Sequence, residues 1–268
     1  ALTAFMLVLL TYGMETGFFR FANKQDENPT RVYSTILISV FTTSLLFFLL
    51  VYSNLDSVAA FLGYADHPEY IGMMAAVVAL DAFQSIPFAR LRYLKKAMKF
   101  AGLKLLFIVM NIGLNLLYFL ALPALYESHP EWVGSFYNPG VGVGYAFGIN
   151  LVCTASITVL FWPELTGFRY VFDYRLWRRI LAYSFPILIL GLAGILSQTV
   201  DKIIFPFVYE GTEQAARAQL GIYGAASKIA MIMAMLIQAF RYAYEPFVFG
   251  KSAERDNRDT YAQAMKYF

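Results

Sequence analysis

The sequence is poor in charged residues. Only 15% of its 268 residues are Asp, Glu, Lys or Arg, whereas 59% are hydrophobic and 18% aromatic. Soluble domains hold about a quarter charged and about half apolar residues. The mean hydropathy of +0.55 points the same way. The composition therefore excludes an ordinary soluble domain and favours a protein that lies in lipid.

Residues that carry covalent, metal or redox chemistry are also scarce. A single cysteine, Cys153, excludes an intrachain disulfide and stands in an apolar run, as a small buried residue does. The two histidines, His67 and His129, precede prolines and lack metal-ligand spacing. The sequence has no GxSxG nucleophile motif, P-loop or CxxC pair. We therefore expect no enzyme, no cofactor and no metal ion, and the net charge of +3 gives no reason to expect a nucleic-acid partner.

Seven apolar stretches are long enough to cross a bilayer as helices. About 20 helical residues span the ~30 Å of hydrocarbon, and the backbone finds hydrogen-bond partners there only within helices or closed barrels. Barrel strands alternate strictly over about 10 residues, whereas the run 47–51 is apolar throughout. The sequence therefore predicts an all-α polytopic transmembrane bundle. Its spans are 1–19, 33–52, 71–89, 105–124, 141–162, 183–209 and 221–240.

Lys and Arg are concentrated in alternate connections between these spans. One set of segments holds 18 of the 21 basic residues, namely 20–32, 90–104, 163–182 and 241–268. The other set holds one basic residue, Arg217, and seven acidic ones, and consists of 53–70, 125–140 and 210–220. Because basic connections stay on the cytoplasmic side of a membrane, the first set is predicted to be cytoplasmic and the second to face outward.

The first residues already lie in an apolar stretch, without the basic start and cleavage site of a signal peptide. A cytoplasmic N-terminus of the intact protein requires an odd number of spans before Ala1, and the simplest number is one. We therefore expect 1–167 to form an N-terminal helical lobe that lacks its first helix. Residues 168–182 interleave aromatics with Arg and form a cytoplasmic connector, either an interfacial helix or a basic loop. Residues 183–268 begin a truncated C-terminal lobe.

Charged residues within the spans are the candidate site residues, because each costs about 2.5–3.5 kcal/mol at the membrane centre and therefore faces water or a partner. Asp81 lies halfway along its span, and Lys228 lies roughly 10 Å into its own at 1.5 Å per residue. We expect cations to hold an anionic substrate and acids to couple transport to an ion. The candidate cations are Lys228, Lys202, Arg20 and Arg90, and the candidate acids are Asp81, Asp201, Glu15 and Glu245.

Several of these residues also have structural interpretations. Arg20 and Arg90 stand at inner ends of spans, where long basic side chains reach the interface. An ion pair across helices is an equal alternative for Asp201 and Lys228. Asp81 is the deepest of the charged groups and has the weakest structural explanation.

Four stretches, in this order, resemble polysaccharide flippases. The sequence YGMETGFFRF at 12–21 resembles the end of their second helix, and DAFQSIPFARLRYLKK at 81–96 resembles their fourth helix with its basic exit. YSFP at 183–186 followed by DK at 201–202 is similar to their seventh helix. GIYGAASKI at 221–229 followed by EPF at 245–247 is similar to their eighth.

These flippases belong to the multidrug/oligosaccharidyl-lipid/polysaccharide (MOP) exporter superfamily. The resemblance implies a MATE-like fold of two six-helix lobes arranged as a V, of which this chain covers about helices 2 to 8 of 12 to 14. It also implies alternating access and a substrate that is an O-antigen or capsule repeat unit on a polyprenyl diphosphate, moved across the bacterial inner membrane. The implied partners are this lipid-linked glycan, the bilayer, H⁺ or Na⁺ and other polysaccharide-assembly proteins.

Three other functions remain open. A peptidoglycan-precursor flippase commonly has Arg at the place that Lys228 occupies. A multidrug antiporter of the same superfamily takes cationic substrates, which the pair Lys202 and Lys228 disfavours. A membrane-embedded glycosyltransferase or polymerase would need a large loop bearing acids or His, and the longest connection here has about 20 residues.

Overall fold

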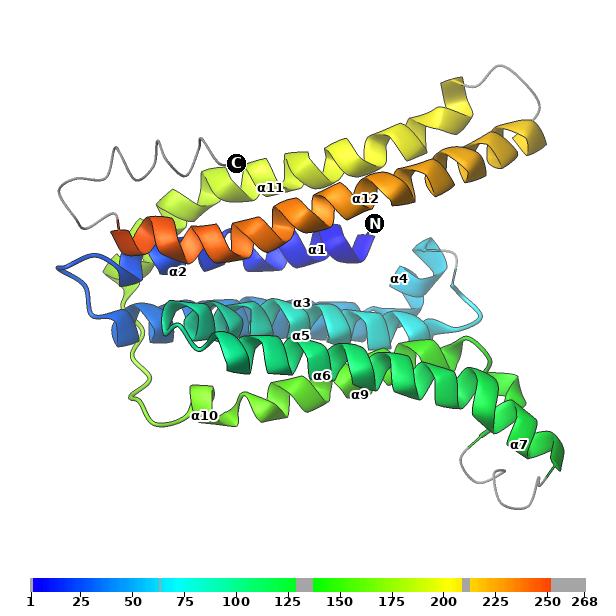
Figure 1. Ribbon diagram of the computed structural model, residues 1–268, viewed down its shortest axis with the longest axis horizontal. Helices are drawn as coiled ribbons and strands as arrows, with labels where there is room; N and C mark the ends of the chain where they lie inside the picture. Colours follow the sequence, from blue (N-terminus) through cyan, green and yellow to red (C-terminus); the bar gives the residue numbers. More distant parts are fainter. Residues whose placement is uncertain (1, 63, 129–136, 209–212, 252–268) are drawn as a thin grey trace. The chain divides into compact units, whose positions relative to one another are not determined.

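The computed structural model describes residues 2–62, 64–128, 137–208 and 213–251. Regular structure in these residues is helical, without a strand (Figure 1). The elements are α1 (Leu2–Thr11), α2 (Met14–Ala22), α3 (Pro29–Ser53), α4 (Leu55–Phe61), α5 (Pro68–Tyr93), α6 (Ala97–Leu116), the π-helical η1 (Leu117–Ala121), α7 (Leu122–Ser128), the 3-10 turn η2 (Pro139–Val141), α9 (Gly144–Leu160), α10 (Trp162–Leu165), α11 (Tyr174–Val208) and α12 (Glu213–Lys251).

Six helical stretches among the described residues are long and apolar enough to cross a membrane. They are Leu2–Ala22, Pro29–Ser53, Pro68–Tyr93, Ala97–Tyr126, Tyr174–Ser197 and Gly221–Tyr242. The remaining predicted span, 141–162, is represented by α9, which has 17 residues and is shorter than the other six. The prediction of an all-α polytopic membrane protein is confirmed.

The chain packs as two units. The unit formed by both ends of the chain, called the terminal unit here, comprises Ala1–Val32 and Asp173–Phe268, and the central unit comprises Tyr33–Phe172. The second boundary between them falls inside the predicted connector 168–182. Within that connector, helix begins only at Tyr174, with α11. The division into lobes at 167 and 183 stays a prediction.

A left-handed turn separates α1 from α2 in the terminal unit. Tyr12 and Gly13 have φ angles of 33° and 70°, a region that side chains with a Cβ rarely adopt. A Cβ on Gly13 would lie 2.8 Å from the carbonyl oxygen of Ser184, and one on Gly17 would lie 2.6 Å from Ser184 Oγ. Two glycines four residues apart thus bring α2 directly against α11, as small residues do between membrane helices.

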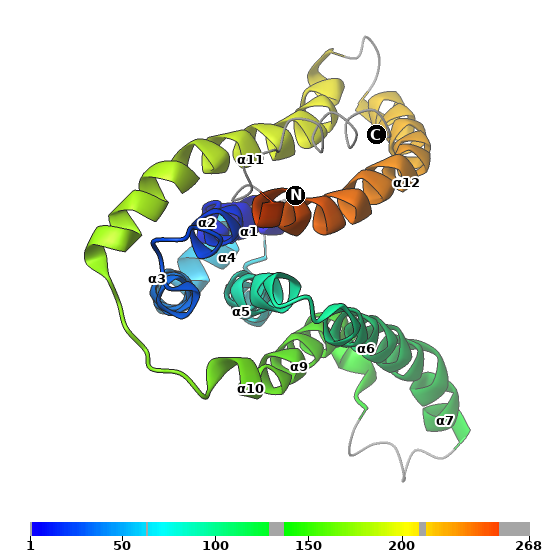
Figure 2. The same cartoon turned by 60° about the vertical axis from the view of Figure 1, so that its left-hand side comes forward.

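The central unit is built on α5, α6 and α9, with α9 packed against both other helices (Figure 2). Its buried cluster consists of Phe88, Leu91, Leu103, Ile157 and Phe161. A polar contact links α5 to α9 within this unit, because Gln84 Nε2 donates to the carbonyl oxygen of Thr154 at 2.8 Å and to Thr158 Oγ1 at 2.7 Å.

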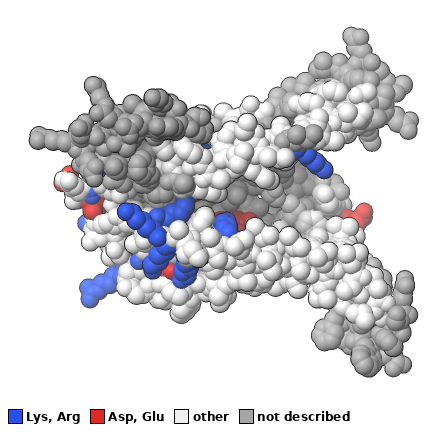
Figure 3. Space-filling view, in the orientation of Figure 1, with Lys and Arg blue, Asp and Glu red and all other residues white. Residues whose placement is uncertain are grey.

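The two predicted sets of connections lie at opposite ends of the central unit. At one end, Lys99 near the start of α6 pairs with Glu164, which follows α9. At the other end, Tyr70 Oη, near the start of α5, donates to the carbonyl oxygen of Val141 at 3.3 Å. In the lower part of Figure 3, which holds the central unit, most of the visible Lys and Arg side chains lie toward the left-hand end. This arrangement agrees with the predicted placement of 90–104 and 53–70 on opposite sides of the membrane.

Candidate functional site

Asp81 is a half-buried carboxylate midway along α5. It forms no hydrogen bond or ion pair with any residue that the structure describes. Its carboxylate interacts electrostatically with the ammonium of Lys104 on the neighbouring α6. Lys104 Nζ lies 4.2 Å from the ring centroid of Phe88, two turns further along α5. Lys104 was counted in the sequence only as part of a basic connection, and the structure adds it to the surroundings of Asp81.

Lys228 is exposed on α12. Its ammonium makes no ion pair with any side chain in the described part of the chain. The predicted partner Asp201 lies on α11, as does Lys202, and Glu245 lies on α12. The side chains of these three residues lie outside the described part of the structure, so their predicted roles stay predictions.

Glu15 and Arg20 both lie on α2, in its first and last turns. Glu15 is half-buried and interacts with other groups of the protein. The guanidinium carbon of Arg20 lies 4.1 Å from the ring centroid of Tyr183 on α11. Such a cation–π contact contributes roughly 0.5–1 kcal/mol at an exposed site, so Arg20 helps to hold α2 against α11.

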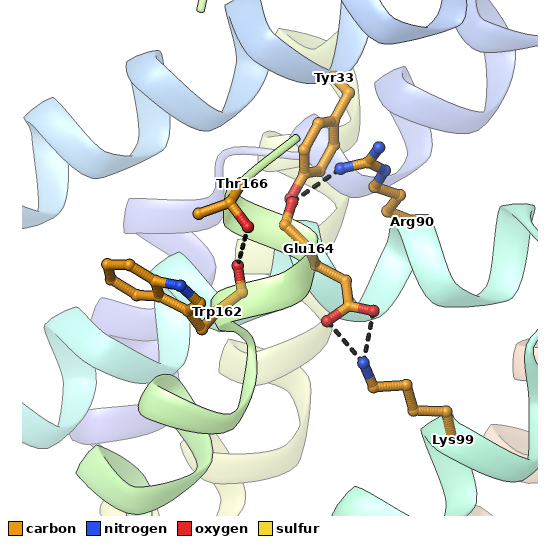
Figure 4. Close-up of polar contacts among 6 residues, drawn as sticks. All are labelled: Tyr33, Arg90, Lys99, Trp162, Glu164 and Thr166. Atoms are coloured by element: carbon orange, nitrogen blue, oxygen red, sulfur yellow. Dashed lines mark hydrogen bonds and ion pairs between the residues drawn. The ribbon is translucent and has the colours of Figure 1, made fainter. Parts of the chain in front are cut away.

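Arg90 is enclosed by protein groups at the end of α5 (Figure 4). Its guanidinium carbon lies 4.3 Å from the ring centroid of Tyr33 and 4.9 Å from that of Phe168. Its Nη1 donates to the carbonyl oxygen of Glu164 at 2.7 Å. Tyr33 Oη donates to the same carbonyl at 3.2 Å. Arg90 thus fastens the segment after α9 to α3 and α5.

The side chain of Glu164 makes a further attachment. Lys99 Nζ donates to both carboxylate oxygens, at 2.7 and 2.8 Å (Figure 4). Glu164 was not among the candidates predicted from the sequence, because it lies outside the spans in a mainly basic connection that also holds Asp173. Its ion pair with Lys99, 65 residues away, leaves no signal in the sequence.

Residues 165–172 leave this cluster and are anchored again before α11. The backbone N–H of Val171 donates to Ser34 Oγ at 2.7 Å, and Thr35 Oγ1 donates to the Val171 carbonyl at 3.4 Å. In the terminal unit, Asp173 Oδ1 accepts the N–H of Leu176 at 3.1 Å and Asp173 Oδ2 pairs with Arg31 at 2.7 Å. The hydrogen bond from the start of α11, together with nearby Arg31, holds the pKa of the Asp173 carboxyl below its usual range.

No group of three or more His, Cys, Asp or Glu residues within 2–62, 64–128, 137–208 and 213–251 is arranged to hold a metal ion.

A family model described as polysaccharide biosynthesis protein matches residues 1–246. This match includes all eight candidate site residues. No curated protein and no solved structure matches the chain.

Proposed function

Because the chain belongs to the polysaccharide biosynthesis protein family, the O-antigen and polysaccharide flippases of the MOP superfamily, we propose that it moves a polyprenyl-diphosphate-linked oligosaccharide repeat unit across the bacterial inner membrane. The resemblance seen in the sequence is confirmed. The protein is a multi-pass membrane protein connected with polysaccharide synthesis. We propose this substrate, an ion or substrate gradient as the energy source, and alternating access between two lobes.

The observation that carries this proposal is the ammonium of Lys228, which lies on a spanning helix without an ion pair among the described residues. A charge in such a position is costly unless a ligand or water receives it. A diphosphate offers several oxygens that accept charge-assisted hydrogen bonds. A Lys in place of an Arg supplies a point charge, which tolerates different orientations of the diphosphate as it moves.

Asp81 supports the second half of the proposal, ion coupling. Its half-buried carboxylate has no hydrogen-bond partner among the described residues and interacts electrostatically with the ammonium of Lys104. Such a carboxylate suits reversible binding of H⁺ or Na⁺ during a transport cycle. The sequence has no ATP-binding motif, so an ion or substrate gradient is the energy source that we propose.

Among the remaining candidates, Arg20 and Arg90 hold parts of the protein together. We propose that they support the transport path without binding the substrate. Lys202 remains a second candidate for the diphosphate. Glu15, Asp201 and Glu245 remain candidate ion-coupling acids. The exposed ammonium of Lys228 favours an anionic substrate over the cationic drug of a multidrug antiporter.

The substitution Lys228→Ala in the complete protein tests this proposal in cells. We expect surface polysaccharide to be lost while the amount of protein in the membrane stays normal, and Lys228→Arg to retain it. The exposed Lys96, in the basic connection before α6, gives the control Lys96→Ala, which should leave polysaccharide unchanged. Normal polysaccharide with Lys228→Ala would remove the proposed role in diphosphate binding.

A further inference from the structure

An apolar pocket lies in the central unit between α3, α5 and the segment that follows α9. Its volume is about 270 Å³, and it is lined by Leu37, Ile38, Phe41, Phe83, Leu165 and Tyr170. We call it the α3–α5 pocket. Phe41 and Phe83 meet edge to face across it, with ring centroids 5.7 Å apart. An open pocket with an apolar, partly aromatic lining suits a hydrocarbon ligand.

The wall formed by Leu165 and Tyr170 is held in place from several sides. Tyr170 Oη donates to the carbonyl oxygen of Leu165, and the Tyr170 ring lies 4.8 Å from that of Phe168. The residues before and after this wall are fixed as well, Glu164 by Lys99 and Val171 by Ser34. Contacts within the central unit therefore position the cytoplasmic wall of the pocket.

A cation adjoins this wall in the sequence. Arg169 lies between Phe168 and Tyr170 in the chain, is exposed, and makes no hydrogen bond or ion pair with a described residue. It belongs to the connection that the charge pattern places in the cytoplasm. One guanidinium group can donate two parallel hydrogen bonds to two oxygens of a phosphate group. An apolar pocket with an exposed arginine directly before its lining residue Tyr170 fits an amphiphile whose hydrocarbon chain ends in phosphate groups.

We propose that the α3–α5 pocket receives the isoprene units next to the diphosphate of the polyprenyl carrier, while Arg169 binds the diphosphate at the cytoplasmic surface. The aromatic rings of Phe41, Phe83 and Tyr170 supply large apolar surfaces against which the isoprene units would pack. The inference rests on the proposed function for the identity of the carrier. It adds a place where the lipid part docks, on the central unit, whereas Lys228 lies on the terminal unit.

Photo-crosslinking of the complete protein tests this site directly. The variant Phe41→p-benzoylphenylalanine places the photoreactive group in the pocket, where the native Phe41 is 51% exposed. The control variant carries the same group at Leu50, on α3 outside the pocket and 65% exposed. Each is reconstituted in nanodiscs of phosphatidylethanolamine and phosphatidylglycerol with tritiated polyprenyl diphosphate. We expect label at position 41 and not at 50, suppressed by unlabelled polyprenyl diphosphate but not by added phosphatidylglycerol.

A second comparison tests the cation. Adding Arg169→Ala to the Phe41 variant should reduce labelling about tenfold, the loss expected for one charge-assisted phosphate contact. Arg169→Lys should restore part of it. Arg178→Ala is the control, because Arg178 is an exposed arginine in the same predicted connector that makes no hydrogen bond or ion pair with a described residue.

Any of four results would overturn the proposal. These are equal labelling at 41 and 50, competition by phosphatidylglycerol, a crosslink from position 41 to the protein itself, and full labelling with Arg169→Ala. These outcomes differ from failure of the proposed function. Absent labelling combined with polysaccharide loss in Lys228→Ala would refute the pocket alone. Specific labelling combined with normal polysaccharide in Lys228→Ala would refute the role of Lys228 and leave the pocket standing.

Discussion

Lys99 and Glu164 form a two-pronged ion pair that ties the start of α6 to the segment after α9. Its two members differ in environment, since the Glu164 side chain is 4% exposed and that of Lys99 is 36% exposed. The carboxylate is therefore the member that cannot recover water when the pair is broken. This attachment also positions the wall of the α3–α5 pocket, so the pair links stability to the proposed lipid site.

The substitution Lys99→Met should destabilise the protein by about 2–4 kcal/mol, because it leaves a buried carboxylate without a counter-charge. Glu164→Gln should cost less, about 1–2 kcal/mol, because its amide retains polar contacts and the ammonium left behind reaches water. Thermal unfolding in detergent measures both. Equal losses in the two variants would show that burial of Glu164 does not control the energy of the pair.

The close approach of α2 to α11 gives a second prediction. A Cβ at Gly17 would lie 2.6 Å from Ser184 Oγ and 3.0 Å from Ile180 Cγ2, so Gly17→Ala forces the two helices apart and should cost about 1–3 kcal/mol. Gly102→Ala on α6 is the matched control, since nothing lies within 4 Å of its added Cβ. The control should be neutral or slightly stabilising by helix propensity. Equal thermal stability of the two variants would contradict the packing described for α2.

The N-terminus of α11 should respond to acid through Asp173. Its folded-state pKa is lowered, chiefly by the N–H of Leu176, so its contribution to stability is complete above the ordinary value of 3.8 and disappears as the pH falls through the lower folded-state value. Asp173→Asn retains a helix-capping side chain but does not titrate. We expect the stability difference between wild type and Asp173→Asn to vanish at low pH, as followed by unfolding between neutral and acid pH. A difference independent of pH would contradict this assignment.

Asp81→Asn tests ion coupling. The amide keeps the size of the side chain and loses the charge that binds a cation or proton, so transport driven by an ion gradient should fall at least about tenfold, while passive exchange of the substrate persists. Transport by the complete protein in vesicles with and without an imposed gradient provides the measurement. Ser85→Ala, one turn further along α5, is the control. Gradient-driven transport that is unchanged in Asp81→Asn would exclude Asp81 from coupling.

The helices were predictable because hydrocarbon requires long apolar stretches and because basic residues gather in the cytoplasmic connections between them. The predicted span 33–52, for example, lies within α3 (Pro29–Ser53). The break at Tyr12 and Gly13 was not predicted, because the apolar run 1–19 continues across it and the turn depends on Ser184, far away in the sequence.

The candidate site was harder to predict, because the sequence identifies charges in the membrane but not their partners. Arg90 was expected to line a transport path, and the structure places it between the rings of Tyr33 and Phe168. Neither these rings nor the ion pair of Glu164, formed across 65 residues, follow from periodicity or composition. Among the candidate site residues whose side chains the structure describes, Asp81 and Lys228 make no hydrogen bond, ion pair or ring contact with a described residue.

The most direct test of the proposed function is translocation by the complete protein in proteoliposomes. A fluorescent oligosaccharide on polyprenyl diphosphate is placed in both leaflets, and a membrane-impermeant glycosidase reports how much of it is accessible from outside over time. We predict that the wild-type protein makes the whole pool accessible and that Lys228→Ala leaves the inner half protected. Equal accessibility with wild type, Lys228→Ala and protein-free vesicles would contradict the account.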